Sequence, residues 1–195
     1  MTIPTRITLA RLIMSPLFVV LAIKYNSTIK LGNPDVIYLY LAMLVFALAV
    51  ISDALDGYLA RKLNQQSRIG SFLDPIADKT LLLSATITLT FIDCGNPLPI
   101  FYTTLILSRE LIQISGAIAI GAILGDIKVK HHWTGKFSTF MQVILIYSAF
   151  IVPSETVILY LAFIGGFFTF SSAALYIYAG LSQLPEEVHA STEVI

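Results

Sequence analysis

The sequence predicts an all-α integral membrane protein built as a bundle of six transmembrane helices. Of its 195 residues, 56% are hydrophobic and 12% are charged, about half the charged fraction of an ordinary soluble domain, and the mean hydropathy is +0.82. A helix crosses a bilayer core with roughly 20 apolar residues. Six stretches are candidates: Ile7–Ile23, Val36–Ile51, Thr80–Ile92 as the continuation of a segment that begins near Ser67, Leu98–Leu124, Phe137–Val152 and Thr156–Leu181. We expect one membrane domain over residues 1–184 and a polar C-terminal tail over residues 185–195.

The distribution of lysine and arginine predicts the orientation of these segments. The connections are short and polar, as at Asn33-Pro34, so neighbouring helices should be antiparallel. One side carries eight cations: Arg6, Arg11, Arg61, Lys62, Arg68, Lys128, Lys130 and Lys136. The first loop of the other side has only Lys24 and Lys30. Because cations concentrate on the cytoplasmic side, we expect both termini and the active site to face the cytoplasm, in a bacterial inner membrane or its equivalent.

Four aspartates make the strongest chemical signal in the chain. Asp53 and Asp56 are three residues apart, and Asp74 and Asp78 are four apart, so each pair shares one face of a helix. A charged group within a membrane helix costs at least ~2.5–3.5 kcal/mol on the insertion scale, which makes such a cluster a functional hypothesis by default. Mutual repulsion and desolvation both oppose ionisation of the four carboxyls. A bound cation would relieve both effects.

The ligand type narrows the identity of that cation. Carboxylate oxygens suit Mg²⁺ or Mn²⁺, Ca²⁺ is an alternative, and zinc is disfavoured without histidine or cysteine in the cluster. Four carboxylates are enough for two ions, an arrangement that commonly clamps a phosphoryl or diphosphate group during displacement. Net formal charge is zero, so no basic excess indicates a nucleic-acid partner.

Small residues accompany the acids. Gly57, Ala60 and Gly70 remove side-chain bulk beside them, which lets a ligand approach the helix backbone. The alternative is that they only allow close helix packing. Arg61 lies near the predicted helix end, where it can reach a phosphate oxygen or serve as an interfacial anchor.

Together these residues resemble a known family. The string Asp53-x2-Asp56-Gly57-x2-Ala60-Arg61-x8-Gly70-x3-Asp74-x3-Asp78 resembles the signature of the CDP-alcohol phosphatidyltransferases at every fixed position and spacing. The opening Ile3-Pro4-Thr5-Arg6-Ile7-Thr8-x2-Arg11 and the six-segment layout also fit. The resemblance implies metal-dependent transfer of a phosphatidyl group from CDP-diacylglycerol to an acceptor hydroxyl in phospholipid biosynthesis, with release of CMP. It also implies two divalent ions and a homodimer.

The resemblance further implies a role for each signature residue. Asp53, Asp56 and Asp74 would bind metal, while Asp78 would bind metal and deprotonate the acceptor hydroxyl. Gly57 and Ala60 would lie against the cytidine nucleotide of the donor, with Arg61 and Gly70 completing the donor site.

Two branches of the family fit best, and both use an acceptor with an anionic phosphate. Phosphatidylglycerophosphate synthases use glycerol 3-phosphate, and CMP-forming cardiolipin synthases use phosphatidylglycerol. A cationic acceptor site is therefore expected, and Arg109 and Lys136 are its candidates. Both resemble elements of the glycerophosphate branch, but the second arginine common in that branch is absent from Ile114–Ile118, and Ser108-Arg109-Glu110 also resembles the cardiolipin branch. We favour glycerol 3-phosphate.

Two structural interpretations and one other function remain open. In one, Arg109 has a purely structural role as the ion-pair partner of Glu110 or another acid. In the other, Lys136 is a plain interfacial anchor. Intramembrane acids also build cation or proton pathways in transporters. A carrier should place polar groups along a path through the membrane, whereas these acids cluster on two segments near one face, so a transporter is the distant alternative.

Overall fold

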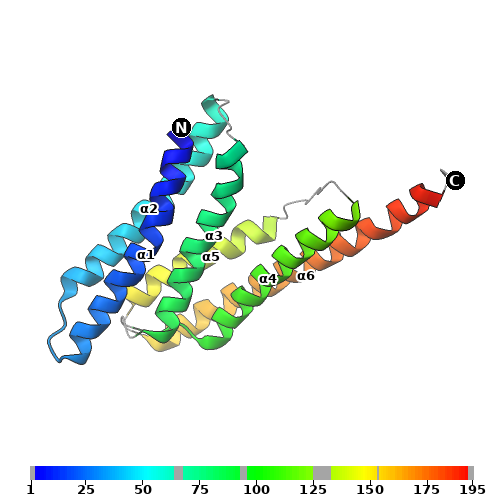
Figure 1. The fold of residues 1–195 in the computed structure, drawn as a ribbon. Coiled ribbons are helices and arrows are strands. Elements are labelled where there is room, and N and C mark those ends of the chain that lie inside the picture. The colour runs from blue at the N-terminus through cyan, green and yellow to red at the C-terminus, as the bar shows by residue number, and fades with distance from the viewer. Residues whose placement is uncertain (1–2, 64–67, 93–95, 125–132, 153, 193–195) are drawn as a thin grey trace. The chain divides into compact units, whose positions relative to one another are not determined.

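The computed structural model describes residues 3–63, 68–92, 96–124, 133–152 and 154–192, with side chains over 10–52, 79–92, 96–116, 118, 133–152 and 154–180. Within that part, the regular secondary structure consists of six α-helices (Figure 1): α1 (Ile3–Lys30), α2 (Val36–Leu63), α3 (Arg68–Phe91), α4 (Ile100–Leu124), α5 (Trp133–Ile151) and α6 (Glu155–Thr192). The all-α prediction is confirmed.

The six predicted apolar segments each coincide with one helix, and several helices are longer than the apolar runs within them. α1 begins at Ile3 and ends at Lys30, and Gly32 follows it with a φ of 76° that ends the helix. α6 continues to Thr192, past the predicted boundary at residue 184. Two stretches among the described residues are long and apolar enough to cross a membrane, Ala10–Lys30 and Glu155–Gly180. The six-span topology stays a prediction.

The chain forms two compact units. The first comprises Met1–Leu98 and Ile146–Ile158, and the second comprises Pro99–Leu145 and Leu159–Ile195. The first unit therefore holds α1, α2 and α3 with the end of α5 and the start of α6. The second holds α4 with most of α5 and α6.

In the first unit, α1 packs against both α2 and α3. The ring of Phe18 lies 5.6 Å from that of Phe46 on α2, and Phe46 in turn lies 5.4 Å from Tyr147 on α5. On the α3 side, the hydroxyls of Ser15 and Ser84 are hydrogen-bonded at 2.8 Å. α1 is thus joined to α2 by aromatic packing and to α3 by a polar contact.

In the second unit, glycines on α6 allow a close approach to α4. Tyr102 is 0% exposed, and a Cβ added to Gly165 would lie 3.1 Å from its ring. The next residue, Gly166, has more room, since its added Cβ would meet Leu105 Cδ1 at 3.4 Å. Neighbouring glycines on one helix therefore differ in how tightly they are packed.

This difference predicts opposite effects of two alanine substitutions. Alanine is favoured over glycine in a helix by about 1 kcal/mol, so Gly166→Ala should leave the thermal midpoint in detergent unchanged or raise it. Gly165→Ala should lower the stability by about 1–3 kcal/mol, because the buried Tyr102 ring has to move and overpacking costs this much. Equal midpoints for the two variants would contradict the described packing of α4 on α6.

Candidate functional site

The signature acids lie on the two helices that flank residues 64–67, in the first unit. Asp53 and Asp56 belong to the last third of α2, and Asp74 and Asp78 belong to the first half of α3. The helical backbone confirms the periodicity that places each pair on one face. The side chains of these four residues lie outside the described residues, as do those of Gly57, Ala60, Arg61 and Gly70. Their predicted roles stay predictions.

The burial of Arg11 on α1 was not predicted from the sequence. Arg11 is counted among the predicted cytoplasmic cations, but its side chain is only 1% exposed. Arg11 precedes Ser15 by one helical turn, on the face of α1 that contacts α3. The position of Arg11 within an apolar run could have indicated its burial. A buried guanidinium requires polar partners.

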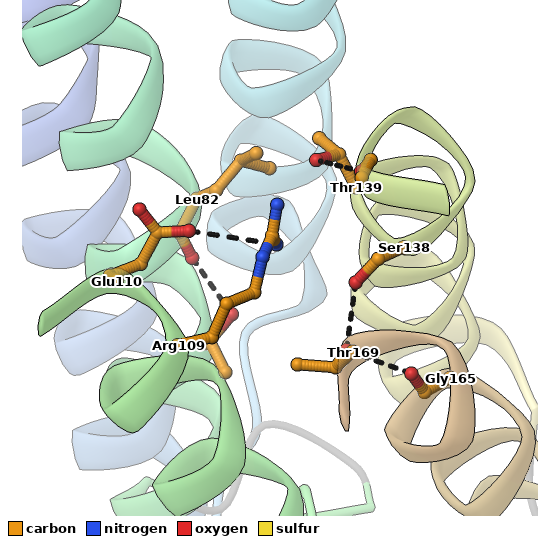
Figure 2. A network of polar contacts seen from close by, with 9 residues as sticks. Leu82, Arg109, Glu110, Ser138, Thr139, Gly165 and Thr169 are labelled. Carbon is orange, nitrogen blue, oxygen red and sulfur yellow. Dashed lines mark hydrogen bonds and ion pairs between the residues drawn. The ribbon is translucent and has the colours of Figure 1, made fainter. Parts of the chain in front are cut away.

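The interior of the second unit holds a buried ion pair. Arg109 and Glu110 on α4 have side chains that are 7% and 11% exposed, and Arg109 Nη1 lies 3.5 Å from Glu110 Oε1 (Figure 2). This distance is longer than the ~2.7–2.9 Å of a strong charge-assisted hydrogen bond. Arg109 Nε is buried and has no hydrogen-bond partner among the described residues. The guanidinium therefore retains hydrogen-bonding capacity beyond its ion pair.

Helices α5 and α6 are joined beside this pair by a buried hydrogen bond. The hydroxyls of Ser138 and Thr169 are 2.8 Å apart, and Thr169 also donates to the carbonyl of Gly165 (Figure 2). Ser138 and Thr169 are 1% exposed. A polar contact of this kind fixes the rotation of one helix against the other.

One turn from that hydrogen bond, Gly135 on α5 faces both α4 and α6. A Cβ added to Gly135 would lie 3.4 Å from Ser172 Oγ and 3.8 Å from Arg109 Nη2. Ser172 is 5% exposed. Three helices thus bring a guanidinium, a hydroxyl and a glycine backbone together in the second unit.

The two predicted acceptor-site cations have different environments. Arg109 is buried beside Gly135, and it pairs with Glu110 as the structural interpretation anticipated. Lys136 follows Gly135 in the first turns of α5, but its side chain is exposed. The structure thus brings Arg109 to the start of α5, whereas Lys136 is exposed.

Comparison with known proteins identifies the family. A family model described as CDP-alcohol phosphatidyltransferase matches residues 1–168. The chain belongs to this family. Among its relatives, a "CDP-diacylglycerol--glycerol-3-phosphate 3-phosphatidyltransferase" of Bacillus subtilis is 33% identical over 147 residues, which are 74% of each chain. The family therefore agrees with the resemblance carried by the aspartate signature.

Two further relatives carry names from both branches. A "Probable phosphatidylglycerophosphate synthase" of Mycobacterium tuberculosis is 38% identical over 148 residues, which are 75% of this chain, and the match spans 64% of the relative's length. A "Cardiolipin synthase (CMP-forming)" of Homo sapiens is 29% identical over 191 residues, 89% of this chain and 58% of the relative. Both relatives belong to the same family, so family membership alone does not decide which acceptor this chain uses.

The hydrogen bond between α5 and α6 predicts a measurable coupling. In a double-mutant cycle, Ser138→Ala and Thr169→Val should couple by about 0.5–1.5 kcal/mol, the usual net value of a buried hydrogen bond. The measurement is the free energy of unfolding in mixed detergent micelles. As a control, Ser171→Ala removes a hydroxyl that bonds only within α6, at 2.8 Å to the Phe167 carbonyl, and it should not couple to Ser138→Ala. Zero coupling for Ser138 with Thr169 would refute a stabilising contact.

Proposed function

We propose that this chain transfers the phosphatidyl group of CDP-diacylglycerol to glycerol 3-phosphate and releases CMP. The observation that carries the proposal is the Bacillus subtilis relative, whose name states this reaction and which aligns over 74% of both chains. The complete aspartate signature supports it, because no signature acid has been replaced. The product would be phosphatidylglycerophosphate, an intermediate of phospholipid biosynthesis.

In this reaction the acceptor hydroxyl attacks the phosphorus that carries diacylglycerol. The bond from that phosphorus to the CMP oxygen breaks, and CMP leaves with the electron pair. The hydroxyl proton goes to a carboxylate, the role we assign to Asp78. Gly57, Ala60, Arg61 and Gly70 would hold the donor nucleotide and its phosphates. These assignments rest on the positions of the residues in the signature.

The metal-ligating groups of the signature suit divalent metal ions. Asp53, Asp56, Asp74 and Asp78 supply only carboxylate oxygens, the ligands that Mg²⁺ and Mn²⁺ prefer. Two such ions, when bound, would neutralise the diphosphate and the CMP leaving group. Among the described side chains, no group of three or more histidine, cysteine, aspartate or glutamate residues offers another metal site.

Arg109 and Lys136 are the residues proposed to bind the acceptor's phosphate. The buried position of Arg109 favours recognition of a small anion, because a desolvated guanidinium interacts more strongly with charge than an exposed one. Phosphatidylglycerol is the second candidate acceptor, supported by the human cardiolipin synthase relative and its match to 89% of this chain.

The surface of α6 supports a membrane location. Its buried face carries Ala162, Thr169 and Ser172, while its outer face carries Phe167 and Phe170 at 67% and 64% exposure. Large aromatic side chains outside and small polar ones inside are the arrangement expected for a helix in lipid. We propose that all six helices span the membrane, with both termini and the active site on the cytoplasmic side. We further propose a homodimer.

The deciding experiment measures CMP release by the purified chain in detergent with CDP-diacylglycerol and Mg²⁺. One reaction contains glycerol 3-phosphate and the other contains phosphatidylglycerol. We expect turnover only with glycerol 3-phosphate. Turnover only with phosphatidylglycerol would make the chain a cardiolipin synthase. Absence of CMP release in both reactions would overturn the proposed activity.

Substitution of the proposed base gives a separate prediction. Asp78→Asn is nearly isosteric but cannot accept a proton from the acceptor, so CMP release should fall by at least about 10²-fold, a typical contribution of general base catalysis. The matched control is Asp35→Asn. Asp35 is exposed before α2 and accepts a hydrogen bond from the Ile37 amide, which asparagine also accepts. Activity retained by Asp78→Asn, with normal folding, would remove Asp78 from the base role.

A further inference from the structure

A buried stripe on α1 contains a single charged residue. Arg11, Ser15, Phe18 and Ala22 follow one another at intervals of four, three and four residues, so they share one face of the helix. All four side chains are buried, and Arg11 is the charged member of the stripe. A guanidinium in this position needs an anionic or polar partner within the first unit, because burying an unpaired charge is costly.

A matching stripe on α2 contacts the stripe on α1. Ala42, Phe46 and Ala49 are 0% exposed and repeat the intervals of four and three residues. The two helices pack against each other (Figure 1), and the short connection of residues 31–35 makes them antiparallel. The rings of Phe18 and Phe46 lie 5.6 Å apart and set the register. The two stripes are therefore aligned pair by pair.

This register places Arg11 opposite Asp53. Arg11 is seven residues before Phe18, and Asp53 is seven residues after Phe46. In an antiparallel pair both steps lead in the same direction, by about 10.5 Å or roughly two helical turns. Asp53, four residues after Ala49, is also the next position of the α2 stripe. The buried cation of α1 is thus level with the first acid of the signature.

The signature acids on α3 are less well placed. Ser84 marks the face of α3 towards α1, because its hydroxyl is hydrogen-bonded to Ser15 at 2.8 Å. Asp78 is six residues before Ser84, which turns it by roughly 120° around the helix. α1 and α3 run in the same direction (Figure 1), and Asp74 lies about 9 Å beyond the level of Arg11 along α3. The α3 acids are displaced from Arg11 in direction or in level.

We propose that Arg11 forms an ion pair with Asp53 and is a positioning residue for the metal site. One edge of the planar guanidinium holds the carboxylate, whose remaining oxygen lone pairs stay available to a metal ion. The carboxylate is thereby oriented before the ion binds, which is the role of hydrogen-bonding partners behind metal ligands. The positive charge also offsets part of the repulsion among the signature acids. The inference rests on the metal-binding role proposed for Asp53.

A double-mutant cycle tests the ion pair in the metal-free protein, with EDTA present. Asp53→Asn leaves a buried guanidinium without its counter-charge, but only where Arg11 is retained. Its effect on the thermal midpoint should therefore be more destabilising, by at least about 3 °C, in the wild-type background than in the Arg11→Met background. Asp78→Asn is the matched control, and its effect should be the same in both backgrounds. Equal effects of Asp53→Asn in the two backgrounds would overturn the proposal.

Titration with Mn²⁺ separates positioning from a purely structural role. Mn²⁺ should raise the thermal midpoint of the wild type, because it binds the folded state. Arg11→Lys keeps the charge but loses the planar fork, so the Mn²⁺ concentration at half of this shift should rise roughly tenfold or more. Ser15→Ala removes the contact with Ser84 one turn along the same stripe. It should lower the midpoint without changing the Mn²⁺ dependence.

Both measurements are independent of turnover. If the wild type releases no CMP with glycerol 3-phosphate but shows the coupling and the Mn²⁺ pattern, the proposed reaction fails and Arg11 keeps its positioning role. If CMP release is normal and Arg11→Lys has the Mn²⁺ dependence of the wild type, the positioning role alone is overturned. If Mn²⁺ does not shift the wild-type midpoint, the metal-binding role of Asp53 and the positioning role of Arg11 are both overturned.

Discussion

Polar groups buried between apolar helices require hydrogen-bond or ion-pair partners. This requirement constrains how the helices pack in both units of the protein. In the second unit, the guanidinium of Arg109 is paired with Glu110 and faces Gly135, while Ser138 and Thr169 satisfy one another between α5 and α6. A buried polar group without a partner costs more than the net value of the bond it lacks. The rotations of α4, α5 and α6 therefore follow from where their few polar residues can meet. The apolar faces that remain are turned outward.

The same constraint explains why small residues occur where they do. Gly165 lets the Tyr102 ring approach α6, and Gly135 lets Arg109 and Ser172 approach α5. The two glycines have similar geometry but different consequences. At Gly165 the space is already filled by a buried ring, so the glycine serves packing. At Gly135 the neighbours are polar, Ser172 Oγ and Arg109 Nη2, and they lie at ordinary contact distance.

Much of the fold was predictable from the sequence, because lengths of apolar segments and polar breaks are local properties. All six helices were expected, although polar ends such as Asn26–Lys30 of α1 remain helical beyond the apolar run. The aspartate signature was also visible, since helical spacing alone aligns its members. The surroundings of Arg109 were not predictable, because the contact between Gly135 and Ser172 depends on how α5 and α6 rotate. The burial of Arg11 likewise depends on which face of α1 meets α3.

We propose that this member of the CDP-alcohol phosphatidyltransferase family uses a phosphomonoester acceptor. The most direct measurement supplies one reaction with CDP-diacylglycerol, Mg²⁺ and equal concentrations of glycerol 3-phosphate and phosphatidylglycerol, and identifies the lipid product by mass spectrometry. We expect phosphatidylglycerophosphate to accumulate and cardiolipin not to form. Cardiolipin as the main product would contradict it and assign the chain to the other branch of the family.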